Sequence, residues 1–197
     1  MKDKFNVRGY IKIESLDKNG KVIDTYEHHN LIVNGARNAF AKLLAGITTQ
    51  PTINCFRMGT KGHVDTDILT PKDSTTGFDV TRQDLFSGSD AGDKNVTFNE
   101  LKFTPSGNLQ QTAAINVTDG ADNLSTVNIQ VTGLELNEPT VTYTFNVAMS
   151  AFNGLNNGMV YTECGLFADD LLMAMRCFPG RVKDSTVSLR ITWNIIF

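Results

Sequence analysis

The chain has 197 residues, of which 41% are hydrophobic and 20% are charged, and its formal net charge at pH 7 is −3. This composition is typical of a globular protein, and the length suits one domain spanning residues 1–197. The basic residues are scattered rather than gathered into a run, which argues against a nucleic-acid partner. No stretch approaches the roughly 18 apolar residues of a membrane-spanning helix, so neither membrane insertion nor secretion is indicated.

Alternation of apolar and polar residues is the dominant pattern, and it starts at the N-terminus. Residues 5–13 place their apolar side chains on one face, and a similar run follows at residues 22–33. Between the two runs, Asn19 and Gly20 are residues that accept the positive φ values of a tight turn. The sequence therefore predicts an antiparallel hairpin.

One segment, residues 34–46, has helical rather than strand-like spacing. Asn34 is a residue type that caps helices, and Gly46 is one that ends them. The apolar residues that fall near helical spacing are Ala36, Phe40, Leu43 and Leu44. We expect one short helix over residues 35–45, packed across an open end or face of a sheet.

The sequence loses its period between about residues 60 and 94, where Gly, Pro, Ser, Thr and Asp are mixed. A surface loop of this length is more often functional or interface-forming than idle. It also carries apolar residues that a solvated linker would not need, namely Ile68, Leu69, Phe78, Val80, Leu85 and Phe86. We predict that these six residues form an assembly surface, and that deleting residues 64–90 leaves a folded protein.

Alternation returns after the loop, most cleanly at residues 139–150 and in the closing run at residues 185–197. Many short strands joined by turns rich in Gly, Asn and Asp are typical of two packed antiparallel sheets. The predicted fold class is all-β, an antiparallel β-sandwich of jelly-roll type with one short helix near the N-terminus. Trp193 lies among apolar residues on one face of the closing run, so we expect it to be buried.

Residue sets that carry catalysis or bind metal are not evident. The sequence contains no GxSxG, HExxH, P-loop or GxGxxG motif. His28 and His29 are adjacent and would face opposite sides of a strand. Asp65 and Asp67 are spaced like calcium ligands but lack the Gly and Glu of an EF-hand, so a turn is the favoured interpretation. We predict neither enzymatic activity nor a bound cofactor or metal ion.

The segment at residues 161–179 reads as two apolar runs around a short turn, which predicts a hairpin. Its first run contains one acid, Glu163, and burying an acid is costly unless it is paired. Two partners are open: backbone N–H groups, or an arginine such as Arg176 on the neighbouring strand. In either case we predict that Glu163 is a structural clamp rather than a general acid.

Three cysteines, Cys55, Cys164 and Cys177, form an odd set without a CxxC motif. Neither a disulfide framework nor a thiolate metal site is indicated, and reduced buried thiols are favoured. Cys164 and Cys177 lie on either side of the hairpin turn, so a disulfide between them stays open as an alternative.

Four segments, "NLIVNGARNAFAKLLAG", "FRMGT", "YTECGLFADDLLMAMRCFP" and "LRITWNIIF", follow one another in an order that resembles a family of tailed-bacteriophage virion structural proteins. The hairpin also resembles one in the N-terminal attachment regions of phage tail-fibre proteins. The resemblance implies a non-enzymatic protein on the particle exterior: a capsid decoration, head-fibre, or neck or tail accessory protein.

The implied partners are other virion proteins, namely capsid, neck or tail subunits, together with further copies of the chain. The implied location is the virion, after synthesis in the host cytoplasm. The alternative is a receptor- or carbohydrate-binding module of a tail fibre, with the loop at residues 60–94 as its site. A structural block buries this loop against neighbours, whereas a receptor module leaves it exposed.

Overall fold

The computed structural model describes residues 7–47, 52–88, 98–105, 113–118, 124–132, 139–153 and 157–197. Ten strands lie in one large sheet: β1 (Arg8–Leu16), β2 (Val22–Ile32), β3 (Cys55–Gly59), β6 (Phe98–Lys102), β7 (Ala113–Thr118), β8 (Leu124–Thr132), β9 (Thr140–Val147), β10 (Met159–Ala168), β11 (Leu171–Lys183) and β12 (Ser188–Ile196). A two-stranded sheet contains β4 (His63–Val64) and β5 (Asp67–Pro71). The helical elements are α1 (Asn34–Leu44) and a 3₁₀ turn, η1 (Ser74–Thr76).

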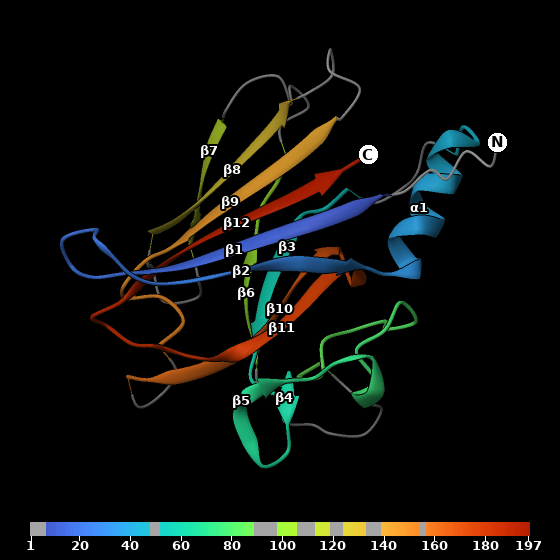
Figure 1. The fold of residues 1–197 in the computed structure, drawn as a ribbon. Coiled ribbons are helices and arrows are strands. Elements are labelled where there is room, and N and C mark those ends of the chain that lie inside the picture. The colour runs from blue at the N-terminus through green and yellow to red at the C-terminus, as the bar shows by residue number, and fades with distance from the viewer. Residues whose placement is uncertain are drawn as a thin grey trace.

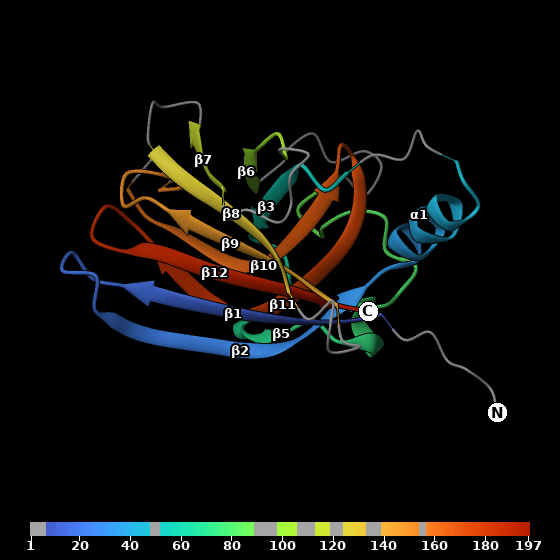
Figure 2. The same ribbon diagram turned by 90° about the horizontal axis from the view of Figure 1, so that it is seen from above.

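The large sheet is antiparallel throughout and curls until it is nearly closed into a barrel (Figure 1 and Figure 2). Its strand order is β6-β3-β10-β11-β2-β1-β12-β9-β8-β7. Strands β3 and β9 are far apart in this order, yet the rings of Phe56 and Phe145 stack with centroids 4.3 Å apart. The contact crosses the interior of the curled sheet, which is a packed core.

Most of the expected elements are present. The N-terminal hairpin is confirmed, since β1 and β2 pair antiparallel and Gly20 has a φ of 76° in the turn. The all-β class with one short helix is also confirmed. The described strands establish one continuous curled sheet, and the jelly-roll sandwich stays a prediction.

The helix differs from expectation at its start. Asn34 is not its cap: Val33 holds that position in an extended conformation, without a side-chain hydrogen bond. The Asn34 amide instead donates to the carbonyl of Val80, 2.8 Å away. Tertiary contact therefore takes over the role that a capping side chain usually has. Gly46, with a φ of 78°, follows the helix end as expected.

The segment predicted to lack regular structure contains β4, β5 and η1, so that part of the expectation is wrong. Its structure comes from short-range bonds that hydrophobic periodicity does not reveal. The Asp73 side chain accepts a hydrogen bond from the Thr75 amide, and the Thr76 hydroxyl accepts one from the Asp73 amide. These reciprocal bonds form a capping box at the start of η1. Residues 89–94 lie outside the described residues.

A second, smaller core covers the outer faces of β3, β10 and β11. Its buried members are Val33, Cys55, Leu85, Phe167, Leu172, Met175 and Cys177, with Leu31, Phe78 and Phe86 packed against them. The β10–β11 hairpin is thus buried on both faces, whereas most of the sheet is buried on its inner face. Burial on both faces explains why residues 161–179 read as nearly continuous apolar runs instead of alternating.

Trp193 lies on β12 between Ile11 of β1 and Tyr143 of β9 and is fully buried, which confirms its expected burial. Among the described residues, its indole Nε1 has no hydrogen-bond partner. We predict that Trp193→Ala lowers the free energy of unfolding by about 3–5 kcal/mol because it leaves a cavity. Trp193→Phe should cost clearly less, because the cavity is smaller and no hydrogen bond is lost. Urea unfolding followed by circular dichroism measures both, and equal losses would contradict the packing account.

Candidate functional site

The most prominent feature outside the large sheet is a short arm, residues 62–72, that contains β4 and β5 (Figure 1). At its base, the Lys72 amide donates to the Gly62 carbonyl at 2.9 Å, and the Gly62 amide donates to the Thr162 hydroxyl of β10, also at 2.9 Å. A Cβ atom on Gly62 would lie 2.5 Å from the Thr162 carbonyl oxygen. Only glycine therefore lets the β4–β5 arm approach β10 this closely.

Glu163 holds the segment after the arm against the same strand. Its side chain is fully buried, and its carboxylate accepts hydrogen bonds from the amide of Phe86 at 2.8 Å and the amide of Ser87 at 2.7 Å. The Ser87 hydroxyl donates to the same carboxylate at 2.6 Å. Hydrogen bonds to a charged acceptor are stronger than neutral ones, so this contact is a firm attachment.

Ser87 extends the attachment to a third segment. Its hydroxyl oxygen accepts from the amides of Thr60 at 2.7 Å and Lys61 at 3.0 Å, while its proton goes to Glu163. The hydroxyl thereby uses its donor and both acceptor positions. We call these five residues, Thr60, Lys61, Phe86, Ser87 and Glu163, the Glu163 anchor.

The environment of Glu163 acts on its acidity in opposite directions. Burial raises the pKa of the carboxyl, because it penalises the charged form. The Ser87 hydroxyl and the amides of Phe86 and Ser87 favour the charged form and lower it. Burial is the larger effect, so the pKa lies above the ordinary value for glutamate.

Arg176 does not meet Glu163. In the β10–β11 pairing, Glu163 lies opposite Cys177 and Arg176 lies opposite Cys164, so the two side chains point to opposite faces of the sheet. Arg176 Nε donates to the Tyr26 hydroxyl at 2.9 Å instead. Of the two partners considered for Glu163, the structure shows the backbone N–H groups.

The same alternation separates the two hairpin cysteines. Cys164 belongs to the larger core and Cys177 to the smaller one. Both thiols are free and buried, as is that of Cys55.

The six residues proposed for an assembly surface fall into two groups. Leu85 is fully buried, and Phe78, Val80 and Phe86 are half-buried against this chain. Ile68 and Leu69, on the β4–β5 arm, are 46% and 64% exposed. The need for apolar burial is therefore met largely within the chain, and of these six residues only the two on the arm are exposed.

This arrangement also corrects the expected effect of deleting residues 64–90. The deletion would remove Leu85 from the smaller core and would take Phe86 and Ser87 from the buried Glu163 carboxylate. Unpaired buried charge and a cavity both destabilise the fold strongly, so we no longer expect a folded remainder. The sequence offers no signal for this contact, because Ser87 and Glu163 are 76 positions apart.

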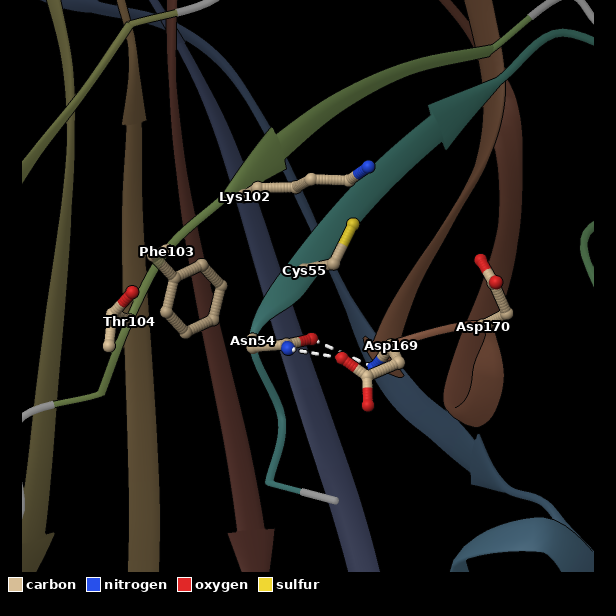
Figure 3. Close-up of a pocket in the computed structure, with 7 residues that line it drawn as sticks. All are labelled: Asn54, Cys55, Lys102, Phe103, Thr104, Asp169 and Asp170. Carbon is tan, nitrogen blue, oxygen red and sulfur yellow. Dashed lines mark hydrogen bonds between the residues drawn. The ribbon is translucent and has the colours of Figure 1, made fainter.

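A polar cleft of about 580 Å³ lies beside the turn between β10 and β11 (Figure 3). Asn54 and Asp169 close one side through reciprocal hydrogen bonds: the Asn54 amide group donates to the Asp169 carboxylate at 2.7 Å, and the Asp169 backbone amide donates to Asn54 Oδ1 at 2.8 Å. The other lining residues are Cys55, Lys102, Phe103, Thr104 and Asp170.

The charged groups at this cleft compensate one another. Arg57 pairs with Glu100 and with Asp170, each at 3.0 Å, and its guanidinium lies 4.2 Å from the centre of the Phe167 ring. Burial raises the pKa of the Cys55 thiol to about 12, so this thiol is protonated at neutral pH and is a poor nucleophile. The cleft suits a polar molecule better than covalent chemistry.

Within the described ranges, no group of three or more His, Cys, Asp or Glu side chains is placed to hold a metal ion. The Asp67 carboxylate stabilises the turn in which it lies: it accepts hydrogen bonds from the Leu69 amide at 2.9 Å and from the Thr70 hydroxyl. His28 and His29 are exposed on β2. None of the helices in the described part of the chain is long and apolar enough to cross a membrane.

Comparison with known proteins adds no identification. No protein-family model matches the chain, and no curated protein and no solved structure matches it significantly.

Substitutions at Glu163 test the anchor. We predict that Glu163→Gln lowers the free energy of unfolding by about 1–3 kcal/mol, because the amide group turns a donor toward backbone donors. Glu163→Ala should cost more, since it leaves all the Phe86 and Ser87 donors unsatisfied. Glu27→Gln is the control: this exposed carboxylate accepts from the Tyr10 hydroxyl and pairs with Lys12, and a surface pair of this kind contributes less than about 1 kcal/mol. Urea unfolding measures all three, and equal effects for Glu163→Gln and the control would refute the anchor.

The raised pKa of Glu163 predicts the pH dependence of this stabilisation. A folded-state pKa above the unfolded value, which is about 4.3 for glutamate, gives stability that is present below the unfolded pKa and lost as pH rises through the folded pKa. The stability advantage of the native protein over Glu163→Gln should therefore be largest near pH 4 and shrink toward neutral pH. An advantage that grows with pH would show that the hydrogen-bond donors outweigh burial.

Proposed function

We propose that this chain is a non-enzymatic bacteriophage virion structural protein on the particle exterior, as a capsid decoration, head-fibre, or neck or tail accessory protein. The class of protein rests on the four sequence segments that resemble tailed-phage virion proteins. Its partners are capsid, neck or tail subunits and further copies of itself, and its location is the virion.

The observation that carries an assembly role is the exposed apolar surface on the β4–β5 arm. Ile68 and Leu69 are 46% and 64% exposed, and Val182 of the adjacent β11 is 56% exposed. Large apolar side chains gathered on a surface mark protein contacts. The arm lies next to the Glu163 anchor and is tied to β10 at Gly62, so little freedom is lost when it docks.

We also propose that the curled sheet has the architecture of a jelly-roll-like β-sandwich. Strands β3 and β9 face each other through the stacked rings of Phe56 and Phe145, as strands of two packed sheets do. A fold of this kind leaves its connecting segments free to form contacts.

A second candidate function is a receptor- or carbohydrate-binding module of a tail fibre, and the polar cleft is the observation that favours it. Asp170 at its rim has a side chain that is 96% exposed, and the Lys102 side chain is 71% exposed. Such groups hydrogen-bond polar ligands. Binding of a glycan that Asp170→Ala abolishes would favour this candidate.

Analysis of particles tests the first proposal. We expect the chain in purified virions of the phage that encodes it. Replacing Ile68 and Leu69 together by Asp should lower its incorporation at least about tenfold, because a contact residue at the centre of an interface contributes at least that factor. Quantitative mass spectrometry of the particles measures this.

The control is Ile23→Asp, since Ile23 is 56% exposed on β2 rather than on the arm. It should leave incorporation unchanged, and thermal unfolding should show that all variants are folded. Absence of the native chain from virions would overturn the virion assignment. Normal incorporation of the double variant would overturn the role of the arm.

A further inference from the structure

An apolar groove of about 280 Å³ lies between α1 and the open end of the curled sheet. Phe40 and Leu43 of α1 form one side, and Tyr143, Ile195 and Phe197 are among the residues that form the other. Most of its lining is apolar. We call it the α1 groove.

The groove combines buried lining residues with exposed apolar side chains of α1. The Tyr143 side chain lines the groove and is only 8% exposed. Leu43, which lines the groove, is 60% exposed, and Leu44 and Ile47 in and just after α1 are 81% and 46% exposed.

The charged residues near the groove indicate which kind of segment binds in it. Helix α1 carries Arg37 and Lys42, both exposed, and no acidic residue. An apolar groove beside a helix whose charged residues are all basic suits a segment that combines a large apolar side chain with carboxylates.

The tip of the β4–β5 arm, residues 64–70, is such a segment. It contains Asp65 and Asp67 and no basic residue, and residues 65–70 are all exposed. The Thr70 hydroxyl and the Leu69 amide lower the pKa of Asp67, which keeps it charged. A Cβ atom on Gly180 would lie 3.2 Å from Ile68 Cγ1, so Ile68 faces β11. Because neighbours in a strand alternate, Leu69 points away from the sheet.

We propose that the chain associates head to tail with itself: Leu69 of one copy enters the α1 groove of the next, and Asp65 and Asp67 meet Arg37 and Lys42. The arm lies below β10 and β11, whereas α1 lies at one end of the sheet (Figure 1). The contact therefore joins two different surfaces of the chain. Such a contact propagates into a ring or an open row.

This inference rests on the proposed assembly function and names its partner surface. Its test uses the full-length purified chain in sedimentation velocity up to about 1 mM, where even a weak contact is half-occupied. The native protein should form dimers and larger species as concentration rises. Leu69→Asp and Leu43→Asp should each weaken self-association at least about tenfold, while Ile23→Asp should leave it unchanged.

Mixing the two variants gives the sharpest outcome. Leu69→Asp keeps an intact groove and Leu43→Asp keeps an intact tip, so a mixture should form 1:1 pairs and nothing larger. Charge reversal gives an independent check: Asp65→Lys and Lys42→Glu should each weaken association, and their mixture should restore a pair. Thermal unfolding shows that every variant is folded.

Several results would overturn the inference. They are a native chain that stays monomeric at about 1 mM, a mixture of the Leu69→Asp and Leu43→Asp variants that forms no pair, or a groove that binds anionic lipid vesicles while the chain is monomeric. Loss of particle incorporation by arm variants of a monomeric chain would also reject it, yet would leave the virion role standing, with a different virion protein as the partner.

Discussion

One buried carboxylate fixes the segment of this protein in which apolar and polar residues do not alternate regularly. The Glu163 carboxylate accepts hydrogen bonds from the amides of Phe86 and Ser87, and the Ser87 hydroxyl accepts hydrogen bonds from the amides of Thr60 and Lys61. The carboxylate is fully buried, which would be costly without these donors. Because each donor comes from a segment without a strand partner, the anchor supplies the hydrogen bonds that a sheet would otherwise provide.

The anchor explains why the β10–β11 hairpin has its unusual sequence. By fixing residues 86 and 87 over the outer face of β10, it brings Leu85 and Phe86 onto Phe167 and Cys177 and creates the smaller core. The hairpin then has a core on each face, and both faces are apolar. The β4–β5 arm projects from the same region, so the residues that stabilise the hairpin also set the direction in which Leu69 is presented.

Regular periodicity made much of the fold predictable. The N-terminal hairpin, the single helix and the burial of Trp193 follow from patterns within each segment, since local spacing decides which face is apolar. The acid in the hairpin was also recognisable, because a lone carboxylate in an apolar run requires donors. Its donors were not: they lie in a segment with no period, and sequence spacing holds no information on contacts between distant positions.

The same limit applies elsewhere. Asn34 has the side chain of a helix cap, but tertiary contact with Val80 replaces it. Leu85 has the hydrophobicity of an interface residue, but only the three-dimensional arrangement shows that it is buried within its own chain. The α1 groove combines α1 with residues from β8, β9, β11 and β12, a set that no local pattern connects.

Native-state hydrogen exchange tests the central role of Glu163 most directly, because it reports on the amides that the carboxylate accepts. Both amides, Phe86 and Ser87, lie outside any strand or helix. If the anchor is part of the core, they should exchange as slowly as the amides of β10, through global unfolding. Exchange of these two amides through local opening, at the rate of exposed turns, would contradict the account.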